Sequence, residues 1–197
     1  RPTAGNRPEF NGSSAIASVE ASLQRLGTDR IDLLFFHSPF GPEEIEDDVW
    51  TALDNLRTAG KVRAIGHSIS KFEDTASMAT TWAQERRIDV IQVVLSLLNR
   101  QTQGLIDQLA PLGIGVLARE SLANGFLSGT VTADTVFPEG TLNARYTSEE
   151  VASRVAQVER LAFLVGGAIQ TLPQAALRWV LDQEGVSCVL TGAGTPD

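Results

Sequence analysis

Polar side chains that could orient a carbonyl group or a cofactor lie at the ends of several short apolar runs. They comprise two histidines, hydroxyls, an amide, a cation and a pair of glycines: His37-Ser38, His67-Ser68, Gln92, Ser96, Arg119-Glu120-Ser121 and Thr191-Gly192-Ala193-Gly194. These groups can donate and accept hydrogen bonds. The set contains no nucleophile elbow, metal-ligand cluster or pair of neighbouring carboxylates. It is therefore suited to holding a cofactor and a carbonyl in place.

The apolar runs that precede these side chains have the length and composition of buried strands. Gly27 follows a helical apolar face where a C-cap glycine is expected, and Thr147 and Glu150 have the spacing of a capping box. Pro173 is compatible with a first helical turn. We expect strands over 31–36, 62–65, 90–95, 114–118 and 186–190, and helices over 14–26, 45–60, 72–86, 102–109, 147–166 and 172–183.

Strands separated by helices in this way predict parallel βαβ units with right-handed crossovers. An open doubly wound sheet and a closed eight-stranded barrel both fit the pattern, and both place ligands at the carboxyl ends of their strands. No G-x-G-x-x-G sequence follows any of the runs, which argues against a dinucleotide-binding half of the open type. Residues 119–147 lack periodicity, and a loop of this length in a compact domain is usually functional.

Composition narrows the class of protein. The 197 residues are 43% hydrophobic and 20% charged, which is typical of a globular domain, and we expect one domain over residues 1–197. The net charge of −8 and the scattered Lys and Arg residues argue against a nucleic-acid or membrane partner. No apolar run approaches the ~20 residues of a membrane helix. The single cysteine, Cys188, fits a reducing, cytoplasmic compartment, and we expect it to be buried.

Five segments in order resemble the aldo-keto reductase family. They are S-L-Q-R-L-G-T-D-R-I-D-L-L-F-F-H (22–37), G-K-V-R-A-I-G-H-S-I-S (60–70), I-Q-V-V-L-S-L-L-N-R (91–100), G-I-G-V-L-A-R-E-S-L-A-N-G-F-L-S-G (113–129) and L-P-Q-A-A-L-R-W-V-L-D-Q-E-G-V-S-C-V-L-T-G (172–192). The resemblance implies a (β/α)₈ TIM barrel, of which this chain would supply the fourth to eighth strands. It also implies reduction of an aldehyde, ketone or sugar carbonyl to an alcohol with NADPH, or alternatively NADH.

The same resemblance implies roles for individual residues. His37 matches the catalytic histidine, which would donate a hydrogen bond to the substrate carbonyl; the alternative is a strand-end histidine bonded to backbone. Ser68 and Gln92 match the positions that hold the nicotinamide carboxamide. Arg119 replaces an aromatic ring against the nicotinamide, where a guanidinium can also stack. The alternative for Arg119 is a surface residue paired with Glu120.

Further cofactor contacts are implied near the later strands. Leu122, Gly125 and Leu127 match the loop that wraps the pyrophosphate, and Gly192 and Gly194 match backbone amides near the adenosine phosphate. Ordinary turn glycines are the alternative for these positions. We further expect His37, Gln92 and Arg119 to face one cavity.

The sequence departs from the family pattern in three places. Ile69 replaces an asparagine that shares the carboxamide contact, and His67 replaces an aliphatic residue; we expect a neutral, buried and hydrogen-bonded histidine, with a second polar group in the site as the alternative. The family's aspartate, proton-donating tyrosine and lysine have no counterpart in residues 1–13, and the only tyrosine, Tyr146, lies late in the chain. We therefore expect the chain to begin beyond the lysine-bearing strand.

The third departure lies at the other end, because the chain stops before the basic segment that selects NADPH in the family. The substrate and the oligomeric state stay open. A small-molecule carbonyl substrate is the expected partner. The alternatives to a reductase are a non-catalytic cofactor-binding or interaction subunit, an inactive fragment, and, less compatible with the ordered segments, an unrelated barrel enzyme.

Overall fold

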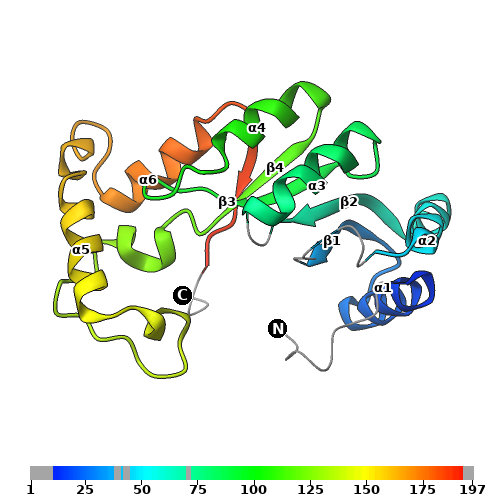
Figure 1. The fold of residues 1–197 in the computed structure, drawn as a ribbon, viewed down its shortest axis with the longest axis horizontal. Coiled ribbons are helices and arrows are strands. Elements are labelled where there is room, and N and C mark those ends of the chain that lie inside the picture. The colour runs from blue at the N-terminus through cyan, green and yellow to red at the C-terminus, as the bar shows by residue number, and fades with distance from the viewer. Residues whose placement is uncertain (1–10, 38–40, 42–44, 70–71, 193–197) are drawn as a thin grey trace. The chain divides into compact units, whose positions relative to one another are not determined.

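The computed structural model describes residues 11–37, 41, 45–69 and 72–192 (Figure 1). Helices and strands alternate as α1 (Gly12–Leu26), β1 (Ile31–His37), α2 (Asp47–Thr58), β2 (Val62–Ser68), α3 (Phe72–Gln84), β3 (Val90–Val94), α4 (Gln103–Leu109), β4 (Gly115–Arg119), α5 (Ser148–Glu159), α6 (Leu172–Leu181) and β5 (Val186–Val189). Short 3₁₀ turns are η2 (Ala110–Leu112), η3 (Ala123–Ser128), η4 (Leu142–Arg145) and η5 (Ala162–Leu164). None of the helices described could cross a membrane.

The strands form one sheet in the order β1-β2-β3-β4-β5. The pairs β1–β2, β2–β3 and β4–β5 are parallel, which confirms the expected α/β class. The chain divides into two compact units, Arg1–Gln92 with Gln108–Gly115, and Val93–Asp107 with Val116–Asp197. We describe each unit separately, and the single-domain organisation stays a prediction.

In the first unit, local signals set the limits of α1. The Asn11 side chain accepts a hydrogen bond from the Ser14 backbone N–H at 2.9 Å, and Gly27 ends the helix with φ 65°. This left-handed conformation favours glycine, as the sequence predicts. Helix α1 packs beside α2 (Figure 1) and buries Val19 and Leu23. The rest of the expected apolar face, Ile16 and Leu26, is exposed.

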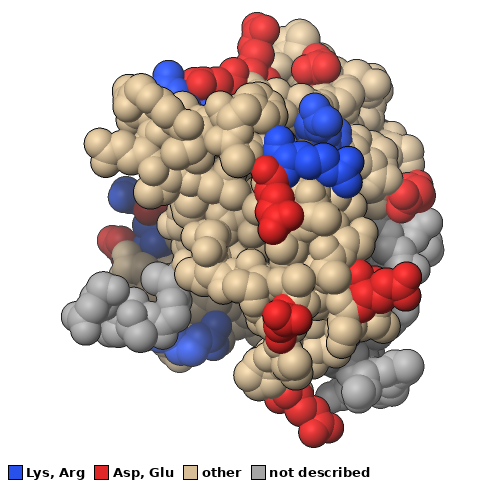
Figure 2. Space-filling view, turned by 90° about the vertical axis from the view of Figure 1, so that its left-hand side faces the viewer, with Lys and Arg blue, Asp and Glu red and all other residues tan. Residues whose placement is uncertain are grey.

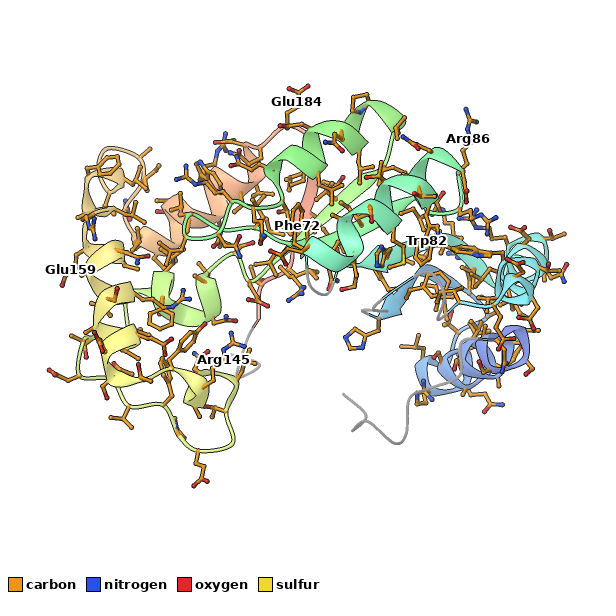
Figure 3. The ribbon with its side chains drawn as sticks, viewed as in Figure 1. Phe72, Trp82, Arg86, Arg145, Glu159 and Glu184 are labelled. Atoms are coloured by element: carbon orange, nitrogen blue, oxygen red, sulfur yellow. The ribbon has the colours of Figure 1, made fainter. Side chains whose placement is uncertain are left out.

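Alternate residues of β1, β2 and β3 face opposite sides of the sheet. Phe36, His67 and Ile91 are register partners on the face that α2 and α3 cover. The ring of Phe36 contacts Trp50 of α2 and Trp82 of α3, with centroids 5.3 and 5.5 Å apart. Figure 3 shows Trp82 between α3 and these strands. The neighbouring residues in sequence must therefore face the side away from α2 and α3.

In the second unit, β4 pairs with β5, and helices surround these two strands. The Thr102 hydroxyl donates to the Val94 carbonyl at 2.9 Å, and α6 packs on β5. The predicted capping box opens α5, because the Glu150 N–H donates to Thr147 Oγ1 at 3.2 Å and the Thr147 N–H donates to Glu150 Oε2 at 2.8 Å. Helix α5 ends at Glu159, earlier than the expected Gly166, and η5 follows it.

Two predictions of burial are wrong. Strand β1 was expected to be buried on both faces, yet Phe36 is its only buried residue. Cys188 of β5 was expected to be buried and is exposed. Both strands lie at the ends of the strand order, so each has a neighbouring strand on one side alone within the described sheet. A short apolar run cannot reveal whether its strand is central or terminal.

Candidate functional site

Three of the predicted side chains form one row across the first unit. His37 is the register partner of Ser68, and Ser68 is the register partner of Gln92. Because paired residues of neighbouring parallel strands share a face, the three belong to the face turned away from α2 and α3. Each lies at or near the carboxyl end of its strand. The strand register therefore brings these three predicted positions together, and their roles stay predictions.

The row is connected by hydrogen bonds. The Ser68 hydroxyl donates to Gln92 Oε1 at 3.3 Å, and the Ile69 N–H donates to the Gln92 carbonyl at 2.9 Å. Ser68 is buried, Gln92 is half-buried and His37 is exposed. The Gln92 amide nitrogen takes no part in the hydrogen bond with Ser68. The row therefore offers a hydroxyl, an amide donor and an imidazole to a ligand.

His67 lies outside this row. Its ring contacts Trp82 edge-on with centroids 5.0 Å apart, on the helix-covered face, so it cannot be a second polar group beside Ser68. Its side chain is fully buried, and burial lowers its pKa from 6.5 to about 4. Among the described residues, neither ring nitrogen has a hydrogen-bond partner. The expectation of a neutral buried histidine holds, but the expected hydrogen bonds are absent.

In the second unit, Arg119 ends β4 and forms an ion pair with Glu120. This ion pair agrees with the alternative interpretation of Arg119, in which it pairs with Glu120. Both side chains are, however, less than one-third exposed rather than fully on the surface. The Arg119 carbonyl accepts a hydrogen bond from the Leu95 N–H at 3.2 Å. Asn124 Nδ2 donates to the second carboxylate oxygen of Glu120 at 3.1 Å. The carboxylate thus links the end of β4 to the following turn.

This turn contains the predicted residues Leu122, Gly125 and Leu127. The N–H groups of Gly125 and Leu127 donate to the Leu122 carbonyl at 3.0 and 3.1 Å. Gly125 has φ 92°, a conformation that requires glycine in practice. Leu127 is fully buried, so its side chain belongs to the core of the unit. Contact of this turn with a pyrophosphate stays a prediction.

An open cavity of about 400 Å³ adjoins the turn. Its walls come from η3, η4 and the segment between them: Asn124, Phe137, Pro138, Thr141, Leu142 and Asn143. Asn143 Nδ2 donates to the Asn124 carbonyl at 2.8 Å, which fixes one wall to the turn. The sequence analysis did not select Asn124 or Asn143, although Asn-Gly at 124–125 is a turn signal that could have drawn attention to them.

The remaining predicted positions lie near the end of the chain. Gly192 is exposed, and Gly194 lies outside the described residues.

Tyr146 contacts Phe126 edge-on at 5.4 Å, and the guanidinium groups of Arg145 and Arg154 lie 5.0 and 4.8 Å from its ring centroid. Figure 3 shows Arg145 in the segment between β4 and α5. No cluster of three metal-ligating side chains occurs in the parts of the chain that are described.

The structure thus groups His37, Ser68 and Gln92 in the first unit, and Arg119 with Leu122, Gly125 and Leu127 in the second. The expectation that His37, Gln92 and Arg119 face one cavity stays a prediction.

Comparison with known proteins gives consistent likenesses. Residues 2–197 match the model of the Aldo/keto reductase family. The chain is 32% identical over 187 residues to an NADH-specific methylglyoxal reductase of Escherichia coli strain K12, covering 91% of this chain and 55% of that protein. It is 31% identical to the aldo-keto reductase YhdN of Bacillus subtilis, covering 94% and 56%. The chain therefore spans about half the length of these relatives.

Solved structures show the same fold. The glycerol dehydrogenase AKR11B4 from Gluconobacter oxydans superposes with a TM-score of 0.75 at 24% identity, covering 96% of this chain and 58% of that one. The holo form of the aldo-keto reductase AKR11C1 from Bacillus halodurans gives a TM-score of 0.70 at 23% identity, covering 98% and 60%. These likenesses confirm the fold class, a five-stranded part of a (β/α)₈ barrel.

Proposed function

Because this chain belongs to the aldo/keto reductase family, we propose that it acts in an NAD(P)H-dependent oxidoreductase that reduces an aldehyde, ketone or sugar carbonyl to an alcohol. The observation that carries this proposal is the row of His37, Ser68 and Gln92 on one face of the sheet. Relatives that reduce methylglyoxal and L-glyceraldehyde 3-phosphate support a small carbonyl compound as substrate.

His37 is the residue that we assign to the substrate. Its imidazole is exposed at the end of β1, where it can donate a hydrogen bond to the carbonyl oxygen. Such a bond orients the substrate and stabilises the negative charge that develops on this oxygen. We assign proton donation to none of the described residues, since Tyr146 is engaged with Phe126 and two arginines in the second unit.

Ser68 and Gln92 fit the carboxamide of a nicotinamide ring. A carboxamide needs both a donor and an acceptor, and this hydrogen-bonded pair has an amide nitrogen left to donate and hydroxyl and carbonyl oxygens that accept. When bound, the cofactor supplies the hydride for the reduction. The buried, apolar Ile69 adds no polar side chain here, so the pair must provide the contact alone.

The other predicted contacts complete this assignment. Arg119 would lie against the nicotinamide ring, the turn formed by Leu122, Gly125 and Leu127 would lie against the pyrophosphate, and Gly192 and Gly194 would lie near the adenosine phosphate. NADPH is the cofactor that we expect, and NADH is the alternative that the E. coli relative supports. We propose a cytoplasmic location and a small-molecule carbonyl as the partner.

The test uses the full-length protein with methylglyoxal and glyceraldehyde, each with NADPH and with NADH, and follows the loss of reduced-cofactor absorbance. We expect His37→Ala to lower kcat by about 100-fold with little change in cofactor affinity, because a transition-state hydrogen bond is lost. We expect Gln92→Ala to raise the cofactor Kd about tenfold. The matched control is Asp182→Asn, which changes an exposed pair on α6.

Turnover that survives His37→Ala undiminished would contradict the role of this residue. Cofactor binding by the wild type with no turnover of any carbonyl would favour the alternative, a non-catalytic cofactor-binding subunit. Absence of both binding and turnover would contradict the whole assignment.

A further inference from the structure

We propose that Glu120 adjusts the preference of this site between oxidised and reduced cofactor by neutralising the charge of Arg119. This inference rests on the proposed function, in which the Arg119 guanidinium lies against the nicotinamide ring. It concerns a residue that the sequence analysis treated merely as a competing partner of Arg119.

The first step is the position of the carboxylate. Glu120 Oε1 pairs with Arg119 Nη1, and Glu120 Oε2 accepts a hydrogen bond from Asn124 Nδ2 at 3.1 Å. The exposed fractions of the Arg119 and Glu120 side chains are 27% and 29%, so solvent screens this pair less than a fully exposed one. The carboxylate is therefore held beside the guanidinium from two directions, and the guanidinium does not act as an isolated cation.

The second step is the backbone. Glu120 has φ 56°, in the left-handed region that residues with a Cβ atom rarely adopt. Ala123 and Asn124 share this conformation, with φ 50° and 56°. The turn is kept in place by the buried Leu127 and by the hydrogen bond from Asn143 to the Asn124 carbonyl. Backbone of this kind is often found at functional sites, and Glu120 forms its ion pair with Arg119 from this conformation.

The third step is the chemistry of the ligand. The nicotinamide ring carries a positive charge when oxidised and none when reduced. An unpaired guanidinium beside the ring would therefore weaken binding of the oxidised form and leave the reduced form almost unaffected. Glu120 cancels this charge, so the pair allows Arg119 to stack on the ring without penalising the oxidised cofactor.

The experiment measures Kd values for NAD(P)⁺ and NAD(P)H on the full-length protein, from quenching of tryptophan fluorescence. We expect Glu120→Gln to raise the ratio of oxidised to reduced Kd about fivefold, the scale of a partly exposed charge pair. Gln keeps an oxygen that can accept from Asn124. Arg119→Gln should shift the ratio in the opposite direction, because a lone carboxylate attracts the oxidised ring. The double variant should return close to the wild-type ratio.

The control is Asp182→Asn, which neutralises the acid of an exposed pair with Arg178 on α6 and should leave the ratio unchanged. An equal change of both Kd values in Glu120→Gln, or no change of the ratio, overturns the inference while the proposed function stands. If Glu120→Gln does not fold, the direction of the ratio in Arg119→Gln decides. A wild-type protein that binds neither form contradicts the proposed function itself.

Discussion

Neighbouring side chains of β2 lie on opposite faces of the sheet, and His67 lies on the face that α2 and α3 cover. Its imidazole is fully buried against Trp82 without a hydrogen-bond partner among the described residues. Burial without compensation disfavours the protonated form most, and this desolvation lowers the pKa of His67. The buried position thus keeps the imidazole neutral.

His67 should therefore make folding stability depend on pH. The pKa of His67 is about 4 in the folded protein, against 6.5 for an ordinary histidine, so the unfolded chain binds more protons between these two pH values. Stability due to this residue is then lost as pH falls from about 6.5 to about 4, by up to about 3 kcal/mol. We expect His67→Leu to remove most of this loss. The measurement is the urea midpoint at about pH 8 and about pH 5.

The control is Gly104→Ala, which changes no titratable group and should leave the pH dependence of the urea midpoint close to that of the wild type. If His67→Leu and the wild type lose equal stability on acidification, the imidazole is not the group responsible.

At the scale of the strand, Gly66 leaves room for the Phe35 ring on the face that carries the row. Gly66 is the register partner of Phe35. A Cβ atom added at Gly66 would overlap the Phe35 ring, with Cδ1 2.6 Å away. The ring thus lies across the position that a side chain would fill, two residues before His37 and Ser68.

We expect Gly66→Ala to destabilise the protein by about 1–3 kcal/mol, because the ring must leave its place. Phe35→Leu should recover part of this loss in the double variant, since a smaller side chain relieves the overlap. Thermal and urea unfolding of the single and double variants measure the coupling.

Gly104→Ala is the matched control for this change. Gly104 lies in α4, and an added Cβ would have no atom within 4 Å. We expect this variant to gain up to about 1 kcal/mol from helix propensity. Additive effects of Phe35→Leu and Gly66→Ala would show that the two side chains do not compete for one space.

The elements were predictable where their signals are local. The Gly27 C-cap and the Thr147–Glu150 capping box depend on a few adjacent residues, and both were found as expected. Burial of β1 and β5 depends on which strands lie beside them, so the sequence prediction for Cys188 was wrong.

The candidate site likewise combines features that local sequence predicts with features that depend on packing. The Ser68–Gln92 hydrogen bond follows from a rule about strand ends and could be anticipated. The missing partners of His67 and the left-handed backbone of Glu120 depend on packing that no sequence window contains. The ion pair of Arg119 with Glu120 was named beforehand and is present in the structure, while contact of Arg119 with a nicotinamide ring stays a prediction.

For the whole molecule, the distribution of charge bears on the choice of partners. The net charge is −8, and Figure 2 shows acidic side chains spread over one face, with the largest basic group beside an acidic one. Long-range repulsion would oppose the approach of an extended polyanion, such as a nucleic acid, to such a surface. Small neutral carbonyl compounds are not repelled by this charge.

We therefore expect no retention of the protein on heparin or DNA columns at about 0.1 M salt, where electrostatic binding is still strong for basic proteins. The wild type and a variant with Asp182→Asn should elute alike, because one charge among many changes little. Retention that declines steeply with added salt would contradict this expectation.

The strict alternation along β2 limits how the length of this strand can change. Deleting or inserting one amino acid between Val62 and Ile65 would exchange the faces of His67 and Ser68. After an insertion the imidazole would take the place beside Gln92. After a deletion the hydroxyl of Ser68 would take the place of the imidazole against Trp82. Changes of two amino acids would preserve the faces, so natural or engineered variation in strand length here should come in even steps.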